Sequence, residues 1–141
     1  MSLQTVQVSA SMKANGYTVG GTSANVLCDQ VKTSTVVIPA GAVNMEVDFT
    51  AKAANVQAFA IESSVPKTVP PTGSDQNVTA KANDITTPAF TLTMALNKQI
   101  QWYIGSTFTN PITADVTKLY FSNSGTDAAE VKILLGDDIT P

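Results

Sequence analysis

The sequence predicts an all-β protein, an antiparallel β-sandwich of two sheets with jelly-roll-like connectivity. An immunoglobulin-like sandwich, without the paired cysteines of antibody domains, is the alternative. Three observations carry this prediction. Apolar and polar residues alternate with a period of two in several segments, which is typical of strands with one buried face. Turn signals separate these short segments from one another. No segment shows the apolar stripe of an amphipathic helix, so helices to connect parallel strands are not expected. The length of 141 residues predicts a single domain, 1–141.

Six segments in the first half are expected as strands. The clearest begins at Val43 and ends at Phe49, where four apolar residues face one way and the three polar residues between them face the other. Asn15-Gly16 is a turn signal, and Pro39 and Gly41 end a run of β-branched residues. Ala-rich residues 51–60 lack a continuous apolar stripe and are not expected to be helical. The six expected strands are 3–10, 17–19, 26–31, 35–38, 43–49 and 57–61.

Residues 90–96 and 100–104 also alternate and are expected to form a hairpin around a turn at Asn97-Lys98. Trp102 shares a register with the isoleucines at 100 and 104, which predicts that its side chain points into the core. In an alternative interpretation, Trp102 and Tyr103 lie on an exposed sheet face and stack on sugar rings, as in a carbohydrate-binding module.

A second hairpin is expected near the end of the sequence. Residues 117–122 and 129–135 both alternate between apolar and polar positions. The residues between them include Gly125, which can adopt the positive φ that a tight turn requires.

Residues 63–88 are expected to form a long Pro-rich loop, because they contain four of the seven prolines. Pro-rich backbone has less conformational freedom to lose on binding, which favours an arm that embraces a neighbouring subunit. Residues near both ends of the sequence could add edge strands to adjacent subunits. The residues expected to contact partners are Leu3, Val6, Val65, Pro66, Val69, Pro70, Pro71 and Ile139.

The composition excludes several classes of chemistry. The sequence has no His, so a Ser-His-Asp or Cys-His arrangement is impossible. Its single cysteine, Cys28, lies in an apolar stretch beside an acidic residue and is expected to be a buried or half-buried thiol with a raised pKa. The basic residues are all Lys and the net charge is −3, so nucleic acid is not an expected partner. No apolar run approaches the roughly 20 residues of a membrane-spanning helix, so no membrane partner is expected.

Acidic residues supply the remaining candidates for chemistry. Glu46 and Asp48 lie two apart on one strand, so both point to the same face, as the paired carboxylates of a glycosidase would. Their neighbours are polar, which favours a solvated face, and no enzymatic activity is expected. Asp75, Asn77 and Asp84, together with the pair at 137–138, could supply oxygen ligands to calcium. They lack the spacing of a calcium loop, so no metal or cofactor is expected.

Low charge and polar outward positions favour a subunit that repeats many times in a symmetric assembly. The stretch VTKLYFSNSGTDAAEVKILLGD, residues 116–137, resembles the closing hairpin of small β-sandwich proteins on tailed-bacteriophage virions. The size and the Thr/Ala/Val/Asn-rich composition also resemble those of phage capsid decoration proteins, often called cement proteins.

This resemblance implies a structural virion protein on the exterior of the capsid. Its partners would be the major capsid protein, whose subunits it would bridge, and further copies of itself in a dimer or trimer. The beginning of the sequence lacks the features of a secretory signal, and synthesis in the host cytoplasm is expected. Another virion component, such as a tail, collar or head-fibre subunit, is the alternative within the same class.

Overall fold

The computed structural model describes residues 3–14, 17–64, 77–95 and 99–138. This part of the chain contains ten strands and a single 3-10 turn, Ala53–Asn55. The 3-10 turn is the only helical element within the expected non-helical stretch 51–60. The strands are β1 Gln4–Ala14, β2 Tyr17–Cys28, β3 Gln30–Ile38, β4 Met45–Ala51, β5 Val56–Ser64, β6 Asn77–Ala82, β7 Thr91–Ala95, β8 Gln99–Tyr103, β9 Val116–Asn123 and β10 Ala129–Asp137.

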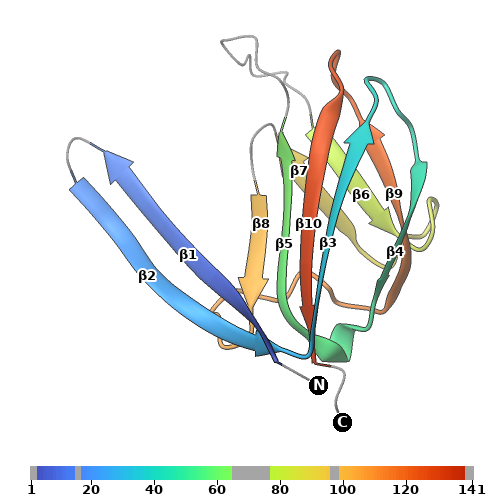
Figure 1. The fold of residues 1–141 in the computed structure, drawn as a ribbon. Coiled ribbons are helices and arrows are strands. Elements are labelled where there is room, and N and C mark those ends of the chain that lie inside the picture. Colours follow the sequence, from blue (N-terminus) through green and yellow to red (C-terminus); the bar gives the residue numbers. More distant parts are fainter. Residues whose placement is uncertain (1–2, 15–16, 65–76, 96–98, 139–141) are drawn as a thin grey trace.

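Eight of these strands form the two-sheet sandwich that the sequence predicts. One sheet, which we call the β5 sheet, has the order β3-β10-β5-β8, and the other, the β6 sheet, has the order β4-β9-β6-β7. All pairs are antiparallel. The pairs β3–β10, β4–β9, β5–β8 and β6–β7 are nested, as in one long hairpin that has been rolled up. This connectivity is that of a jelly roll (Figure 1).

The core lies between the two sheets and is built from the inward residue of each alternating pair. Phe59 and Ile61 of β5 face Leu119 and Phe121 of β9, and all four side chains are almost completely buried. Phe49 of β4 meets the ring of Phe59 edge to face, with ring centroids 6.4 Å apart. The period-two pattern in the sequence therefore identifies most of the core correctly.

Both predicted hairpins are wrong, because in each case the second strand crosses to the other sheet. β7 pairs with β6 and β8 pairs with β5, so the two strands occupy edges of different sheets. β9 and β10 are likewise divided between the β6 sheet and the β5 sheet. Alternation identifies the buried face of a strand, but it carries no information about which neighbour forms the hydrogen bonds.

The prediction for residues 43–49 is wrong at its first residue. The side chain of Val43 is 77% exposed, and the strand begins only at Met45. Asn44 has a φ of 51°, and its backbone N–H donates to Oγ of Ser122 at 3.0 Å. This left-handed residue breaks the alternation, so Val43 falls outside the inward register.

The predicted Pro-rich loop at 63–88 is too long, because it contains the central strand β6. Val78, Ala80 and Ala82 alternate inward and are almost completely buried. The same period-two signal is present in the sequence, but two of its three apolar residues are alanines, which mark an inward position only weakly. Residues 65–76 lie outside the described residues.

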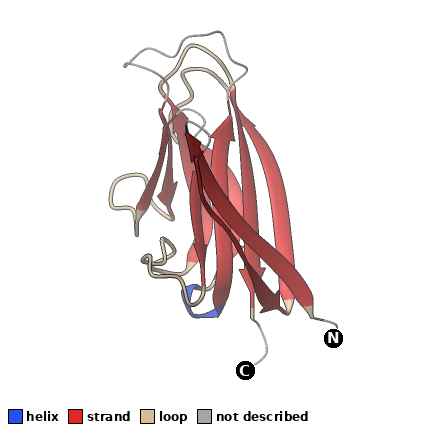
Figure 2. Ribbon diagram, turned by 90° about the vertical axis from the view of Figure 1, so that its left-hand side faces the viewer, coloured by secondary structure: helices blue, strands red, loops and turns tan. Residues whose placement is uncertain are grey.

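Strands β1 and β2 form a third, two-stranded sheet, although the sequence predicted their residues as part of the sandwich. Ala14 pairs with Tyr17 at its far end, and Gln4 pairs with Cys28 at its base. The predicted turn at Asn15-Gly16 lies outside the described residues. The segment 26–31, predicted as one strand, is divided at Asp29 between β2 and β3. Figure 1 shows this ribbon leaving the lower end of the sandwich and diverging from the β5 sheet, and in Figure 2 the ribbon lies in front of the sandwich.

Candidate interaction surface

The base of the β1–β2 ribbon is packed onto the outer face of the β5 sheet. Val6, Val8, Val26 and Cys28 of the ribbon form a small buried cluster with Ala58 of β5. Three half-buried side chains of the sandwich complete this ribbon-base cluster: Val31, Tyr103 and Leu134. This cluster is separate from the main core and lies on the opposite face of the sheet.

A backbone contact and a close approach fix the base of the ribbon. The N–H of Asp29, between β2 and β3, donates to the carbonyl of Asp137 at 2.9 Å. Gly136 faces Cys28 and Val6, and no side chain could be accommodated there without movement of its neighbours. The glycine therefore allows β2 to approach β10 closely at this point.

Asp137 is a buried charge at the same junction. Its carboxylate lies 3.7 Å from Nζ of Lys32, and Oδ1 has no hydrogen-bond partner among the described residues. Burial raises the pKa of Asp137, and the neighbouring Lys32 opposes this rise only in part. Ionisation of this carboxyl therefore costs more free energy in the folded protein than it does at an exposed aspartate.

Cys28 is confirmed as a buried thiol, with 1% of its surface exposed. Burial raises its pKa, and the negative charges of Asp137, Asp138 and Asp29 raise it further. A thiol in this environment stays protonated and is a poor nucleophile.

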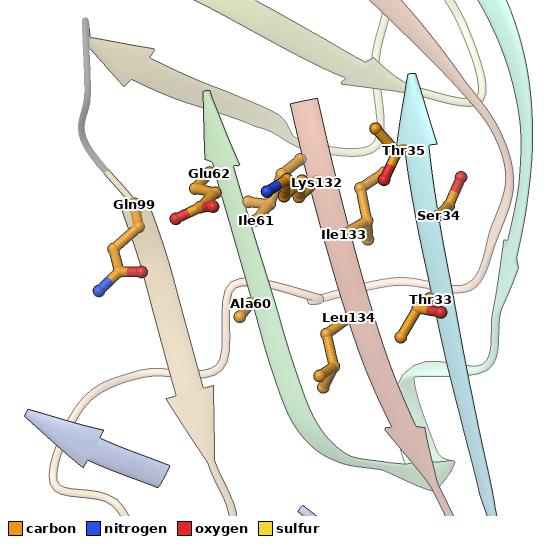
Figure 3. Close-up of a pocket in the computed structure, with 10 residues that line it drawn as sticks. All are labelled: Thr33, Ser34, Thr35, Ala60, Ile61, Glu62, Gln99, Lys132, Ile133 and Leu134. Carbon is orange, nitrogen blue, oxygen red and sulfur yellow. The ribbon is translucent and has the colours of Figure 1, made fainter. Parts of the chain in front are cut away.

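Beyond the ribbon-base cluster, the outer face of the β5 sheet carries an open groove of about 290 Å³ (Figure 3). Ala60 and Leu134 are half-buried and directly opposite one another in the strand register. Glu62 and Lys132 form the next outward pair, so the groove carries one charge of each sign. The lining residues are Thr33, Ser34, Thr35, Ala60, Ile61, Glu62, Gln99, Lys132, Ile133 and Leu134. This outer groove contains a short apolar strip between polar margins.

A smaller hollow of about 230 Å³ lies between β3 and β4. It contains Asp48 and Lys32, together with the half-buried ring of Phe49. Glu46 and Asp48 are both exposed and are on the same side of β4, as the sequence predicts. Lys118 of β9 forms an ion pair with Glu46, and its pKa is raised by that hydrogen bond and charge. Glu46 is therefore engaged in a cross-strand pair on an exposed face.

Trp102 and Tyr103 lie on opposite faces of β8. Trp102 is half-buried against the main core and donates from Nε1 to the carbonyl of Phe108 at 3.0 Å. Tyr103 packs instead in the ribbon-base cluster. The predicted inward position of Trp102 is confirmed as a half-buried one, whereas Ile104 is 52% exposed and lies beyond the strand. The two rings do not form a shared stacking platform.

The acidic residues weighed as cation ligands are dispersed. The carboxylate of Asp84 accepts the N–H groups of Thr86 and Thr87 at 2.7 and 2.9 Å, and these bonds lower its pKa. Asp84 thus closes an exposed turn after β6, whereas Asp137 lies at the ribbon base, and Asp75 lies outside the described residues. Across the described ranges, no three His, Cys, Asp or Glu side chains are grouped closely enough to hold a metal ion.

The structure separates the residues predicted to contact partners. Leu3 precedes β1 and is 58% exposed, whereas Val6 is 7% exposed because it is buried in the ribbon-base cluster. The remaining predicted contacts, Val65, Pro66, Val69, Pro70, Pro71 and Ile139, lie outside the described residues. The outer groove was not predicted, because its residues come from four strands whose order the sequence does not reveal.

Comparisons with known proteins assign no family. No family model matches the sequence, and no curated protein matches it. Among solved structures, a similar chain comes from the Bacillus endospore appendages, described as a novel family of disulfide-linked pili. It is 11% identical, with a TM-score of 0.37 over 78% of this chain and 89% of that chain. No helix in the described part of the chain is long and apolar enough to cross a membrane.

Proposed function

We propose that this protein is a structural subunit without enzymatic activity, a decoration protein that binds the outside of a phage capsid shell. In this role it bridges subunits of the major capsid protein and stabilises the shell. The resemblance of residues 116–137 to virion β-sandwich proteins is the reason for proposing a phage capsid as the shell. The ribbon that extends from an already complete sandwich supports the structural role.

The β1–β2 ribbon is the main support for the proposal, because a two-stranded extension of this kind is difficult to explain in an isolated molecule. A two-stranded sheet is at best marginally stable in water without further strands or a packing surface. Among the ribbon residues whose side chains the structure describes, Val6 and Val8 of β1 and Val26 and Cys28 of β2, all near the base, join a cluster with the sandwich. Within the described residues β1 pairs only with β2, so each strand leaves one edge unpaired.

The composition of the ribbon supports the same role. Residues 4–28 contain a single charged residue, Lys13, and no proline. Free strand edges are usually protected from association by charges, above all lysines, or by proline. An uncharged edge instead favours association, and interface cores are generally depleted of charge.

The test is binding to preassembled capsid shells prepared from the source virus without this protein. We expect the purified protein to co-sediment with the shells and to raise the temperature at which they disrupt. Absence of co-sedimentation, with the protein folded, would contradict the proposal. Electron microscopy of the decorated particles would distinguish a capsid position from a tail, collar or head-fibre position.

A further inference from the structure

We propose that the outer groove of the β5 sheet is the seat for the β1–β2 ribbon of a second copy of this chain. This inference rests on the proposed structural role and specifies how copies contact one another. It assigns one occupant to the groove and one partner to the far half of the ribbon.

Continuity with a contact inside the molecule supports this choice of occupant. The base of the ribbon already packs on the outer face of the same sheet, where valines contact Ala58 and Leu134. Leu134 belongs both to this ribbon-base cluster and to the lining of the outer groove. The groove is therefore an extension of a surface that accepts the ribbon in each molecule.

The width of the groove and the length of the ribbon are also compatible with this contact. The groove crosses four strands, which at about 4.8 Å between neighbours makes a floor about 14 Å wide. This is sufficient for a ribbon of two strands. Residues 9–14 of β1 extend beyond the base by about 20 Å at roughly 3.3 Å per residue, so the ribbon can reach a neighbouring molecule.

The chemistry of the two surfaces is compatible. The groove combines the apolar strip of Ala60 and Leu134 with threonine and glutamine margins, and Glu62 and Lys132 balance one another in charge. The far part of the ribbon is rich in small uncharged residues, with Met12 opposite Val19 in the register. Neither surface brings an unbalanced cluster of charges that would oppose burial.

The course of the ribbon favours a second copy over the molecule's own groove. The pairing of β1 with β2 shifts register between Ser9 and Ser11. Such an irregularity bends and twists a strand pair. The ribbon diverges from the β5 sheet with distance from its base (Figure 1). The far half of the ribbon is thereby directed away from the groove of its own chain.

Disulfide trapping in solution tests the contact directly. One preparation carries Ala10→Cys or Ser11→Cys, tested separately because successive strand residues alternate between faces. The second, labelled with ¹⁵N, carries Thr35→Cys in the groove or Thr93→Cys as the matched control. Thr35 and Thr93 are both exposed threonines on edge strands, but of opposite sheets. Native Cys28 is buried and does not compete.

We expect the mixed dimer with Thr35→Cys to form at least fivefold faster than that with Thr93→Cys, for one of the two ribbon positions. Equal rates of dimer formation with Thr35→Cys and with Thr93→Cys, at both ribbon positions, would overturn the proposal. A chain carrying both Ser11→Cys and Thr35→Cys distinguishes the two sources of the ribbon. Predominant closure within one chain would overturn the second copy as occupant.

Light scattering over a concentration series provides an independent measurement. The variant Thr33→Arg/Thr35→Arg places two charges in the groove and is expected to weaken self-association at least tenfold. The matched variant Thr91→Arg/Thr93→Arg on the other sheet should not weaken it. A wild-type protein that stays monomeric to about 1 mM, an association weaker than about 4 kcal/mol, would overturn the inference. Because shell binding is measured separately, its presence or loss reports on the proposed function alone.

Discussion

Cys28 and Gly136 are in such close contact that a Cβ atom on Gly136 would stand 2.6 Å from Sγ of Cys28. The same atom would lie 3.2 Å from Cγ2 of Val6. Gly136 belongs to β10 of the sandwich, whereas Val6 and Cys28 belong to the two strands of the ribbon. One glycine therefore permits the packing that attaches the ribbon to the sandwich.

Substitution Gly136→Ala is expected to destabilise the protein by about 1–3 kcal/mol, because it overpacks a buried site. Chemical denaturation measures this change in the free energy of unfolding. The double variant Cys28→Ala/Gly136→Ala should recover part of the loss, because the nearest obstructing atom is removed. Additive losses in the double variant would show that the contact with Cys28 is not the cause.

The thiol of Cys28 is expected to be unreactive in the folded protein. It is 1% exposed, and its pKa is raised by burial and by neighbouring carboxylates, so the thiolate is rare at neutral pH. Alkylation by iodoacetamide, followed by mass spectrometry, should be at least 100-fold slower than in denaturant. In Gly136→Ala the rate should increase as the ribbon base loosens. Rapid labelling of the wild-type protein would contradict the buried ribbon base.

The variant Asp137→Asn is expected to be more stable than the wild type at pH 7, by about 1 kcal/mol. The pKa of Asp137 in the folded state lies above its ordinary value of 3.8 because the carboxyl is buried. Ionisation therefore costs stability above the folded pKa, and this cost disappears as the pH falls through it towards 3.8. The lost ion pair with Lys32 is a small offset, because the Lys32 side chain is 41% exposed.

Thermal unfolding between pH 3 and 8 measures this effect. The advantage of Asp137→Asn in Tm should be greatest at neutral pH and should vanish near pH 3. Asp48→Asn, at an exposed position, serves as the control and should show no comparable advantage. A variant that is less stable than the wild type at pH 7 would show that the ion pair with Lys32 outweighs the burial of the charge.

Replacement of Asn123 by Ala is expected to cost about 3 kcal/mol, since three backbone groups, one of them in a buried hydrogen bond, lose their partners. Asn123 is 1% exposed and lies at the end of β9, where the chain crosses to β10. Its Nδ2 donates to the carbonyls of Ile38 and Asp127, and its Oδ1 accepts the N–H of Gly125.

Equilibrium denaturation of Asn123→Ala measures this loss. Asn110→Ala is a suitable comparison, because Oδ1 of the half-buried Asn110 accepts one N–H, that of Ile112. The substitution Asn110→Ala should lower the free energy of unfolding by less than half as much as Asn123→Ala. Similar losses for the two variants would argue against a special role of Asn123 at the crossing.

The sequence was informative wherever burial follows a local pattern. In β10, the four residues at 129, 131, 133 and 135 were predicted to face inward, and all are buried. Cys28 was predicted to be a buried thiol for the same reason, its apolar neighbours. The strand β6 was missed because alanine alternation is a weak signal beside the prolines that precede it.

The candidate surface could not be predicted in the same way. Val6 was expected to contact partners because it lies near the beginning of the chain, yet it is buried by residues of β5 and β8 that are distant in sequence. The outer groove combines Thr35, Ala60 and Leu134 from three strands, and no local pattern brings them together.

The amino-acid sequence alone determined that this chain forms strands and which side of most strands is buried, because these properties depend on residues two positions apart. The tertiary structure decided which strands become neighbours. β9 could have paired with β10 without any change in its own alternation, but it lies in the opposite sheet. Pairing depends on how the two sheets close around a shared core, and that closure also leaves the β1–β2 ribbon outside the sandwich.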